Sequence, residues 1–218
     1  PCEEIYLTQE FADGNAVLVD RVCSLQEDVI VAEVTVDVMQ EMADTVTPQG
    51  ILAVLPIPLL QPKAGKRFVL VPDQVRDPGN LGTMLRTAWA AGVTEVLLPP
   101  GSVDPTNPKV VRAGMGAHFH LPVRKCDWDE LWASVERLTL WLAEAQRGRA
   151  HYAVDWRGDV ALIVGGEAAG AGVASRRAAD YVHIPMAPGV ESLNAAVAAA
   201  IILFEAFRQR SEQVVGLM

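Results

Sequence analysis

Three charged residues stand alone in otherwise uncharged stretches of the 218-residue sequence. Each is the only charged side chain of its stretch: Arg86 within residues 78–94, Glu167 within 160–175 and Glu191 within 181–204. Charged side chains are rarely buried unless they are paired or functional. Two interpretations of Arg86 and Glu167 therefore stay open. Either they form a structural ion pair or lie at exposed ends of their elements, or both belong to a ligand site.

Loops that follow predicted strands favour the second interpretation. They cover residues 77–80, 165–166 and 185–193. In open parallel sheets, ligands bind beside the carboxyl ends of the strands, so these three loops are expected to face one crevice. The two glycine-containing loops match neither a dinucleotide-binding GxGxxG motif nor a Walker A motif. Nothing in them requires NAD or ATP.

The histidines and cysteines indicate neither a nucleophile triad nor a metal site. The four histidines lie outside the glycine loops and are interpreted as structural: His118, His120, His151 and His183. The three cysteines share no CxxC spacing, which argues against zinc and against a disulfide scaffold: Cys2, Cys23 and Cys126. We therefore expect a cytoplasmic protein without metal. The longest apolar runs have ten residues, too few for a membrane-spanning helix of about 20.

Predicted strands and helices alternate along the second part of the chain. Strands are expected over residues 67–72, 95–98, 140–143, 161–164 and 181–184. Helices are expected over residues 80–91, 109–117, 127–138 and 192–210, the last with Ser192 as its N-cap. This alternation predicts an α/β fold with a parallel sheet covered by helices on both faces. Within the last helix, residues 195–207 contain one polar side chain, Glu205, so we expect burial in the core or at a subunit interface.

Charge divides the chain into two parts. Residues 1–62 carry 11 acidic residues and one basic residue, whereas the remaining residues carry 17 basic and 16 acidic ones. The break falls in a Pro- and Gly-containing stretch, so we expect an N-terminal domain over 1–58, a linker over 59–66 and a second domain over 67–218. The acidic first domain, with strand and helix patterns of its own, offers a poor surface to a nucleic acid.

The second domain resembles the SpoU, or TrmH-like, branch of the SPOUT RNA methyltransferases. Residues 77–88 read DPGNLGTMLRTA, which is similar to the N-P-G-N-x-G-x-x-x-R-T-A motif of that family. Residues 165–170 read GGEAAG, similar to G-N-E-x-x-G, and residues 184–186 and 191–194 read IPM and ESLN. The resemblance covers residues 66–210. Residues 1–58 look like the later part of the substrate-binding domain that many members carry, so that domain is expected to be partial.

The resemblance implies a backbone tied in a trefoil knot that binds S-adenosylmethionine, forms a homodimer through the knotted domain and the C-terminal helix, and methylates a ribose 2′-hydroxyl of RNA. The implied catalytic residues are Asn80, Arg86, Glu167, Ser192 and Asn194. The implied cofactor-binding residues are Gly165, Gly166, Glu167, Ile184, Met186 and Leu193. Arg86 would help activate the hydroxyl or position it, and Glu167 would hold Arg86.

Two positions depart from the family pattern, and several substrates stay open. Gly166 stands where the family usually has Asn, and Asp77 stands where Asn is more frequent. Large-subunit ribosomal RNA is favoured over tRNA because the chain carries an N-terminal domain and ends its last helix with Arg-Gln-Arg. A non-catalytic RNA-binding or assembly protein of the same fold is the alternative from another class.

Overall fold

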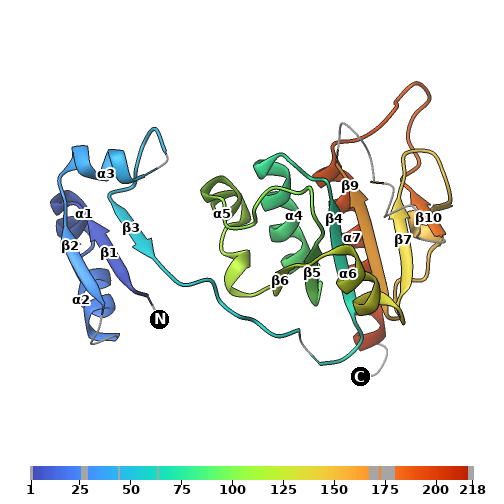
Figure 1. Cartoon of the computed structure of the whole chain (residues 1–218), viewed down its shortest axis with the longest axis horizontal. Coiled ribbons are helices and arrows are strands. Elements are labelled where there is room, and N and C mark those ends of the chain that lie inside the picture. Colours follow the sequence, from blue (N-terminus) through green and yellow to red (C-terminus); the bar gives the residue numbers. More distant parts are fainter. Residues whose placement is uncertain are drawn as a thin grey trace. The chain divides into compact units, whose positions relative to one another are not determined.

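The computed structural model describes residues 2–25, 29–43, 45–62, 64–166, 172 and 180–215. The chain divides into two compact units, Pro1–Pro58 and Leu59–Met218 (Figure 1). Between residues 55 and 67 the described part contains neither helix nor strand.

The first unit is built around a small three-stranded sheet in the order β2-β1-β3. Strand β1 (Glu4–Leu7) pairs in parallel with β2 (Ile30–Glu33) and antiparallel with β3 (Ile51–Val54). The helices are α1 (Gln9–Gly14), α2 (Ala16–Leu25) and α3 (Val36–Met42). Among its described residues, the buried hydrophobic ones are Ile5, Leu7 and Met39.

The second unit is a seven-stranded sheet in the order β6-β5-β4-β9-β7-β10-β8, and every strand pair described in it is parallel. The strands are β4 (Phe68–Asp73), β5 (Glu95–Leu98), β6 (Val123–Lys125), β7 (Thr139–Ala143), β8 (Arg149–Ala150), β9 (Val160–Gly165) and β10 (Asp180–His183). The predicted α/β class with a parallel sheet is therefore confirmed. The sequence pattern missed the short strands β6 and β8.

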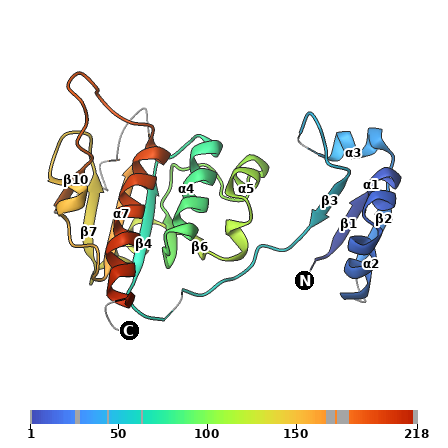
Figure 2. The same cartoon turned by 180° about the vertical axis from the view of Figure 1, so that it is seen from behind.

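Helices cover both faces of this sheet. Alternating residues of the central strand β4 point to opposite sides, Phe68 and Leu70 into one core and Val69 and Val71 into the other. The first core is closed by α4 (Pro78–Ala90) and α7 (Ala195–Val215), and the second by α6 (Trp128–Val135). Figure 2 shows α7 and α4 side by side against the sheet. Near α4 lie α5 (Pro108–Gly114) and the short 3-10 helix η1 (Ala117–Phe119), and a second 3-10 helix, η2 (His151–Ala153), follows β8.

The two edges of the sheet are assembled differently. On one side β4, β5 and β6 follow each other in sequence as well as in space. On the other side β10 lies between β7 and β8, with Val182 pairing with both Ala143 and Arg149. The connection over residues 144–148 therefore joins two strands that a later strand separates. Gly148 adopts a φ of +95°, and a Cβ added there would overlap the Tyr181 carbonyl.

The start of the last helix differs from the prediction. Helix α7 begins at Ala195, and Asn194 caps it, because the Asn194 Oδ1 accepts hydrogen bonds from the backbone N–H groups of Ala196 (2.9 Å) and Val197 (3.1 Å). The predicted N-cap role of Ser192 is therefore wrong. The helix also extends beyond residue 210. Near this end Arg210 donates to the carbonyls of Trp156 and Gly158, which fastens the helix to the segment between η2 and β9.

Candidate functional site

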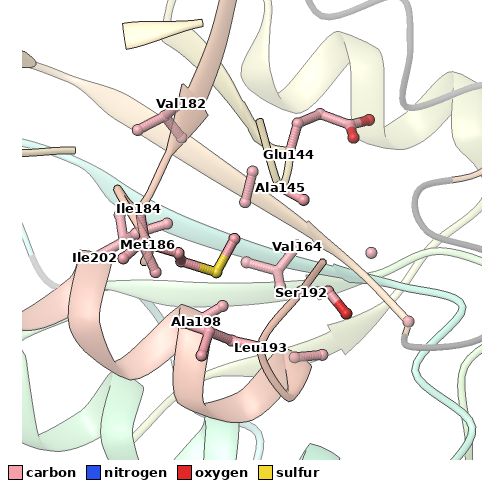
Figure 3. A pocket seen from close by; sticks show the side chains of 14 residues that line it. Glu144, Ala145, Val164, Val182, Ile184, Met186, Ser192, Leu193, Ala198 and Ile202 are labelled. Carbon is pink, nitrogen blue, oxygen red and sulfur yellow. The ribbon is translucent and has the colours of Figure 1, made fainter. Parts of the chain in front are cut away.

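A pocket of about 170 Å³ lies at the carboxyl ends of β7, β9 and β10 (Figure 3). Its walls come from the last residues of these strands, the segment after β10 and the first turns of α7. The residues that line it are Ala143, Glu144, Ala145, Val164, Gly165, Gly166, Val182, Ile184, Met186, Ser192, Leu193, Ala195, Ala198 and Ile202. Its position agrees with the rule that open parallel sheets bind ligands at their strand ends.

The lining is apolar on most sides, with a few polar groups. Met186 and Val164 face the same space in Figure 3, and Ile184 and Ile202 lie on the side of Met186 away from Val164. Among the described residues that line the pocket, two have polar side chains: Glu144, with a carboxylate, and Ser192, with a hydroxyl group. Such a surface suits a largely apolar small molecule that carries a few polar groups.

The structure brings most of the predicted cofactor residues together. Gly165, Gly166, Ile184, Met186 and Leu193 all line the pocket, although 28 positions separate the first from the last. Glu167, which belongs to both predicted sets, lies outside the described residues.

Gly166 occupies a position with no room for a side chain. Its N–H donates to the Asp73 carbonyl (2.8 Å), and an added Cβ would overlap the Gln74 carbonyl. Gln74 itself has a φ of +56°, so the turn after β4 is held in an unusual conformation at this crossing. The glycine that departs from the family's usual Asn is therefore required by the close approach of two strand ends.

Two predicted catalytic residues bind each other beside the pocket. The Asn194 Nδ2 donates to the Asn80 Oδ1 at 3.0 Å, which links the start of α7 to the start of α4. Asp77 caps α4 by accepting from the Asn80 N–H at 2.7 Å. Neither Asn80 nor Asn194 lines the pocket, but Asn194 directly follows Leu193, which does. Ser192, the third of this set, lines it.

Arg86 is exposed, although it lies in the middle of α4 and not at an end of its element. It lies on α4, whose buried face consists of Leu81, Met84, Leu85 and Ala88, and the arginine projects from the opposite side. It makes no ion pair within the described part of the chain, and it does not line the pocket. The structure thus places Arg86 apart from the Asn80–Asn194 pair, further along the same helix. Glu191 is exposed as well.

The histidines and cysteines take no part in the described site. Burial lowers the pKa of His151 and raises the pKa of the Cys126 thiol, so both groups favour their neutral forms. No group of three or more potential metal ligands occurs among the described residues. Nor does any helix in the described chain have the length and apolarity to cross a membrane.

Eight lining residues were not predicted as site residues, and three of them form one segment that the prediction missed altogether: Ala143, Glu144 and Ala145. A signal existed, because the predicted strand over 140–143 ends where they begin, and ligands bind at such ends. The Glu144 N–H donates to the Val182 carbonyl at 2.9 Å, which fixes this loop against β10.

Helix α7 has two apolar faces. Ala199, Ile202, Leu203 and Ala206 are buried in the core of the unit. The other face exposes four large hydrophobic side chains: Val197, Ile201, Phe204 and Phe207. The nearly continuous apolar composition therefore reflects one buried face and one face that the chain leaves exposed.

Comparisons with known proteins agree with this architecture. The sequence model of the SpoU rRNA Methylase family matches residues 67–204. The chain is 40% identical to the 23S rRNA (guanosine(2553)-2′-O)-methyltransferase RlmP of Bacillus subtilis, over 77% of this chain and 68% of that protein. It is 33% identical to the mitochondrial rRNA methyltransferase 3 of Mus musculus, over 84% of this chain and 58% of that protein.

A solved structure has the same fold as this chain. The SpoU methyltransferase AviRb from Streptomyces viridochromogenes, solved with the cofactor AdoMet, superimposes with a TM-score of 0.85 at 25% identity, covering 97% of this chain and 84% of that one. The chain spans little more than half the length of its mouse and human relatives. Because the model of this family matches residues 67–204, which is most of the second unit, the chain belongs to the SpoU rRNA methylase family.

Proposed function

We propose that this protein transfers a methyl group from S-adenosylmethionine to a ribose 2′-hydroxyl of RNA, with large-subunit ribosomal RNA as the substrate. The observation that carries the proposal is the pocket at the ends of β7, β9 and β10, which gathers five predicted cofactor residues from three separate segments. Two relatives named above act on ribosomal RNA, and AviRb was solved with the same cofactor. Transfer RNA is the alternative substrate.

The residues of the chain divide the work between binding and orientation. S-adenosylmethionine supplies an activated methyl group on a sulfonium, so the enzyme has mainly to align it with the ribose oxygen. The hydroxyl gives its proton to solvent as the oxygen gains the methyl group, and the sulfonium is left as a neutral thioether. The apolar side chains around Met186 and Ile184 hold the cofactor in the pocket. Ser192 and the Asn80–Asn194 pair orient backbone and ribose by hydrogen bonds.

Arg86 supplies positive charge to the RNA. A guanidinium stays protonated in proteins, so positioning of the ribose or an adjacent phosphate is its assigned role, together with stabilisation of the negative charge that develops on the hydroxyl oxygen. Glu167 is assigned to hold Arg86, as the family motif implies.

The knot and the homodimer belong to the same proposal. The placement of β10 between β7 and β8 supports a backbone that threads beneath residues 144–148. The exposed apolar face of α7 supports a dimer interface, because burying it in a second copy removes large hydrophobic side chains from water. The N-terminal unit is assigned to substrate binding by its resemblance to part of the family's substrate-binding domain, although its 11 acidic residues make it a poor surface for the RNA itself. Residues 59–66 act as its linker, and the protein works in the cytoplasm.

The test is transfer of labelled methyl from S-adenosylmethionine to unmodified total RNA, followed by separation of the RNA by size. We expect label in large ribosomal RNA. Label confined to tRNA would keep the methyltransferase and change its substrate. Absence of label from every RNA, with cofactor binding intact, would contradict the proposal and favour a non-catalytic RNA-binding protein.

A further inference from the structure

Two aromatic rings stack on the outside of the second unit. Trp89, on α4, and His120, just after η1, lie with their ring centroids 4.3 Å apart and their planes within 5° of parallel. Trp89 is 40% exposed, and His120 is exposed too. Burying aromatic ring surface stabilises a fold, yet part of the ring surface of this stacked pair is exposed to solvent. We call it the Trp89–His120 platform.

Apolar and basic side chains are exposed on the elements that carry the platform and on α5, which packs against α4 and η1. Phe119 (46% exposed) precedes His120, and Met115 (64% exposed) follows α5 as its C-cap. Exposed cationic side chains on the same two helices are Arg86, Lys109 and Arg112. Residues 78–90 and 108–120 contain no Asp or Glu, in a chain whose net charge is −9. This surface is therefore complementary to a polyanion that carries flat apolar rings.

The platform lies next to a predicted catalytic residue. Arg86 and Trp89 are three residues apart on α4, which places their Cβ atoms about 5–6 Å apart on the surface of a helix. Helix α4 also bears Asn80 at its other end, where that residue binds Asn194 beside the pocket. One helix thus runs from the edge of the pocket past Arg86 to the aromatic pair.

We propose that the Trp89–His120 platform binds unpaired RNA by stacking on a base next to the nucleotide that is methylated. This inference rests on the proposed function and adds a substrate-binding residue pair to it. Proteins recognise single-stranded RNA by stacking its bases on aromatic side chains, while basic side chains contact the phosphates. Arg86, Lys109 and Arg112 supply those contacts. A duplex, whose bases are already stacked on one another, does not engage the platform.

The test compares variants of the full chain for affinity toward a labelled, unstructured RNA of about ten nucleotides, by fluorescence anisotropy. Stacking on an aromatic ring contributes about 1–3 kcal/mol per base, so Trp89→Ala is expected to weaken binding about tenfold. Trp89→Phe, which keeps a ring, retains most of the affinity, and His120→Ala loses part of it. Tyr152→Ala removes an exposed aromatic ring far from α4 in sequence and serves as the matched control.

The same variants are assayed for methyl transfer to RNA, cofactor affinity and oligomeric state. We expect Trp89→Ala to raise KM for RNA with little change in kcat, cofactor affinity or oligomeric state. Three results would overturn the inference: wild-type affinity in Trp89→Ala, an equal loss in Tyr152→Ala, or a loss that accompanies a change of oligomeric state. RNA binding that depends on Trp89, without methyl transfer by the wild type, would support the platform and contradict the proposed function.

Discussion

The two halves of the large sheet are built by different rules. From β4 to β6, neighbours in sequence are neighbours in the sheet, and the helix α4 between β4 and β5 packs directly on them. From β9 to β8, the order departs from the sequence, and β10 is inserted between two earlier strands. The sequential half carries Asn80, Arg86 and the Trp89–His120 platform, whereas the inserted half forms the pocket. The proposed reaction needs both, and the Asn80–Asn194 hydrogen bond joins them.

The largest effect is expected from the sequential half. Arg86→Ala should reduce methyl transfer at least about 1,000-fold, because it removes a charge that acts on the reacting ribose. The side chain is exposed and unpaired within the described chain, so folding and cofactor affinity should stay near wild type. Single-turnover assays measure the rate of methyl transfer, and calorimetry measures cofactor affinity. Arg124→Ala removes another exposed arginine, on β6, and should be active. Near-wild-type turnover in Arg86→Ala would show that Arg86 has no role in the reaction.

The next effect tests the crossing in the inserted half. Gly148→Ala should lower the free energy of unfolding by at least about 3 kcal/mol, because its Cβ overlaps a backbone carbonyl that cannot rotate away. Gly92 also has a positive φ (+73°) but open space around its Cα. Gly92→Ala should therefore cost only about 1 kcal/mol of backbone strain. Chemical denaturation measures both variants. An equal loss of unfolding free energy in Gly148→Ala and Gly92→Ala would show that the Tyr181 carbonyl does not lie so close to Gly148.

Helix α7 packs beside both halves, and its exposed face tests the dimer. Ile201→Asp should raise the dissociation constant of the dimer at least about 100-fold, since it places a carboxylate in an apolar interface. Analytical ultracentrifugation reports the change, and Tyr152→Asp is the control at an exposed position outside α7. Leu203 is fully buried within the chain, so Leu203→Asp would disrupt folding and cannot test the interface. A stable dimer of folded Ile201→Asp would contradict the proposed interface.

The smallest effect concerns an ion pair on the same helix. A hydrogen bond from Arg208 (2.7 Å) lowers the pKa of Glu205 to about 2. The stabilisation is therefore complete above the ordinary glutamate pKa and is lost as the pH falls toward 2. Because Arg208 is half exposed, Glu205→Gln should cost only about 0.5 kcal/mol at pH 7. The difference from wild type should shrink in denaturation curves at pH 3, and a constant difference would exclude the ion pair as its cause.

The sequential half of the sheet was easier to predict from the sequence than the inserted half. The strand over 95–98 and the helix over 80–91 were predicted because their apolar patterns are local, although the helix begins at Pro78, two residues before its predicted start, with Asp77 as its N-cap. The insertion of β10 was not predictable from these patterns, because a four-residue strand carries no record of which neighbours it pairs with. Strand β8 has two residues and is too short to give a pattern.

The site shows the same limits. Gly165, Ile184 and Leu193 were chosen by resemblance, and the fold places them in one pocket. The isolation of Arg86 among uncharged residues left open whether it was paired, exposed or part of a site, because an amphipathic helix can carry one long charged residue on its exposed face. Ser192 has the residue type of an N-cap, but Asn194, two residues on, takes that place.

The central claim is that the methyl group goes to a ribose oxygen. The most direct measurement is alkaline hydrolysis of RNA labelled by the wild-type protein, followed by separation of the products. A 2′-O-methyl group blocks cleavage at the adjacent phosphodiester, so we predict that the label appears in an alkali-resistant dinucleotide and is absent from the products of Arg86→Ala. Label recovered in mononucleotides would place the methyl group on a base and contradict the account.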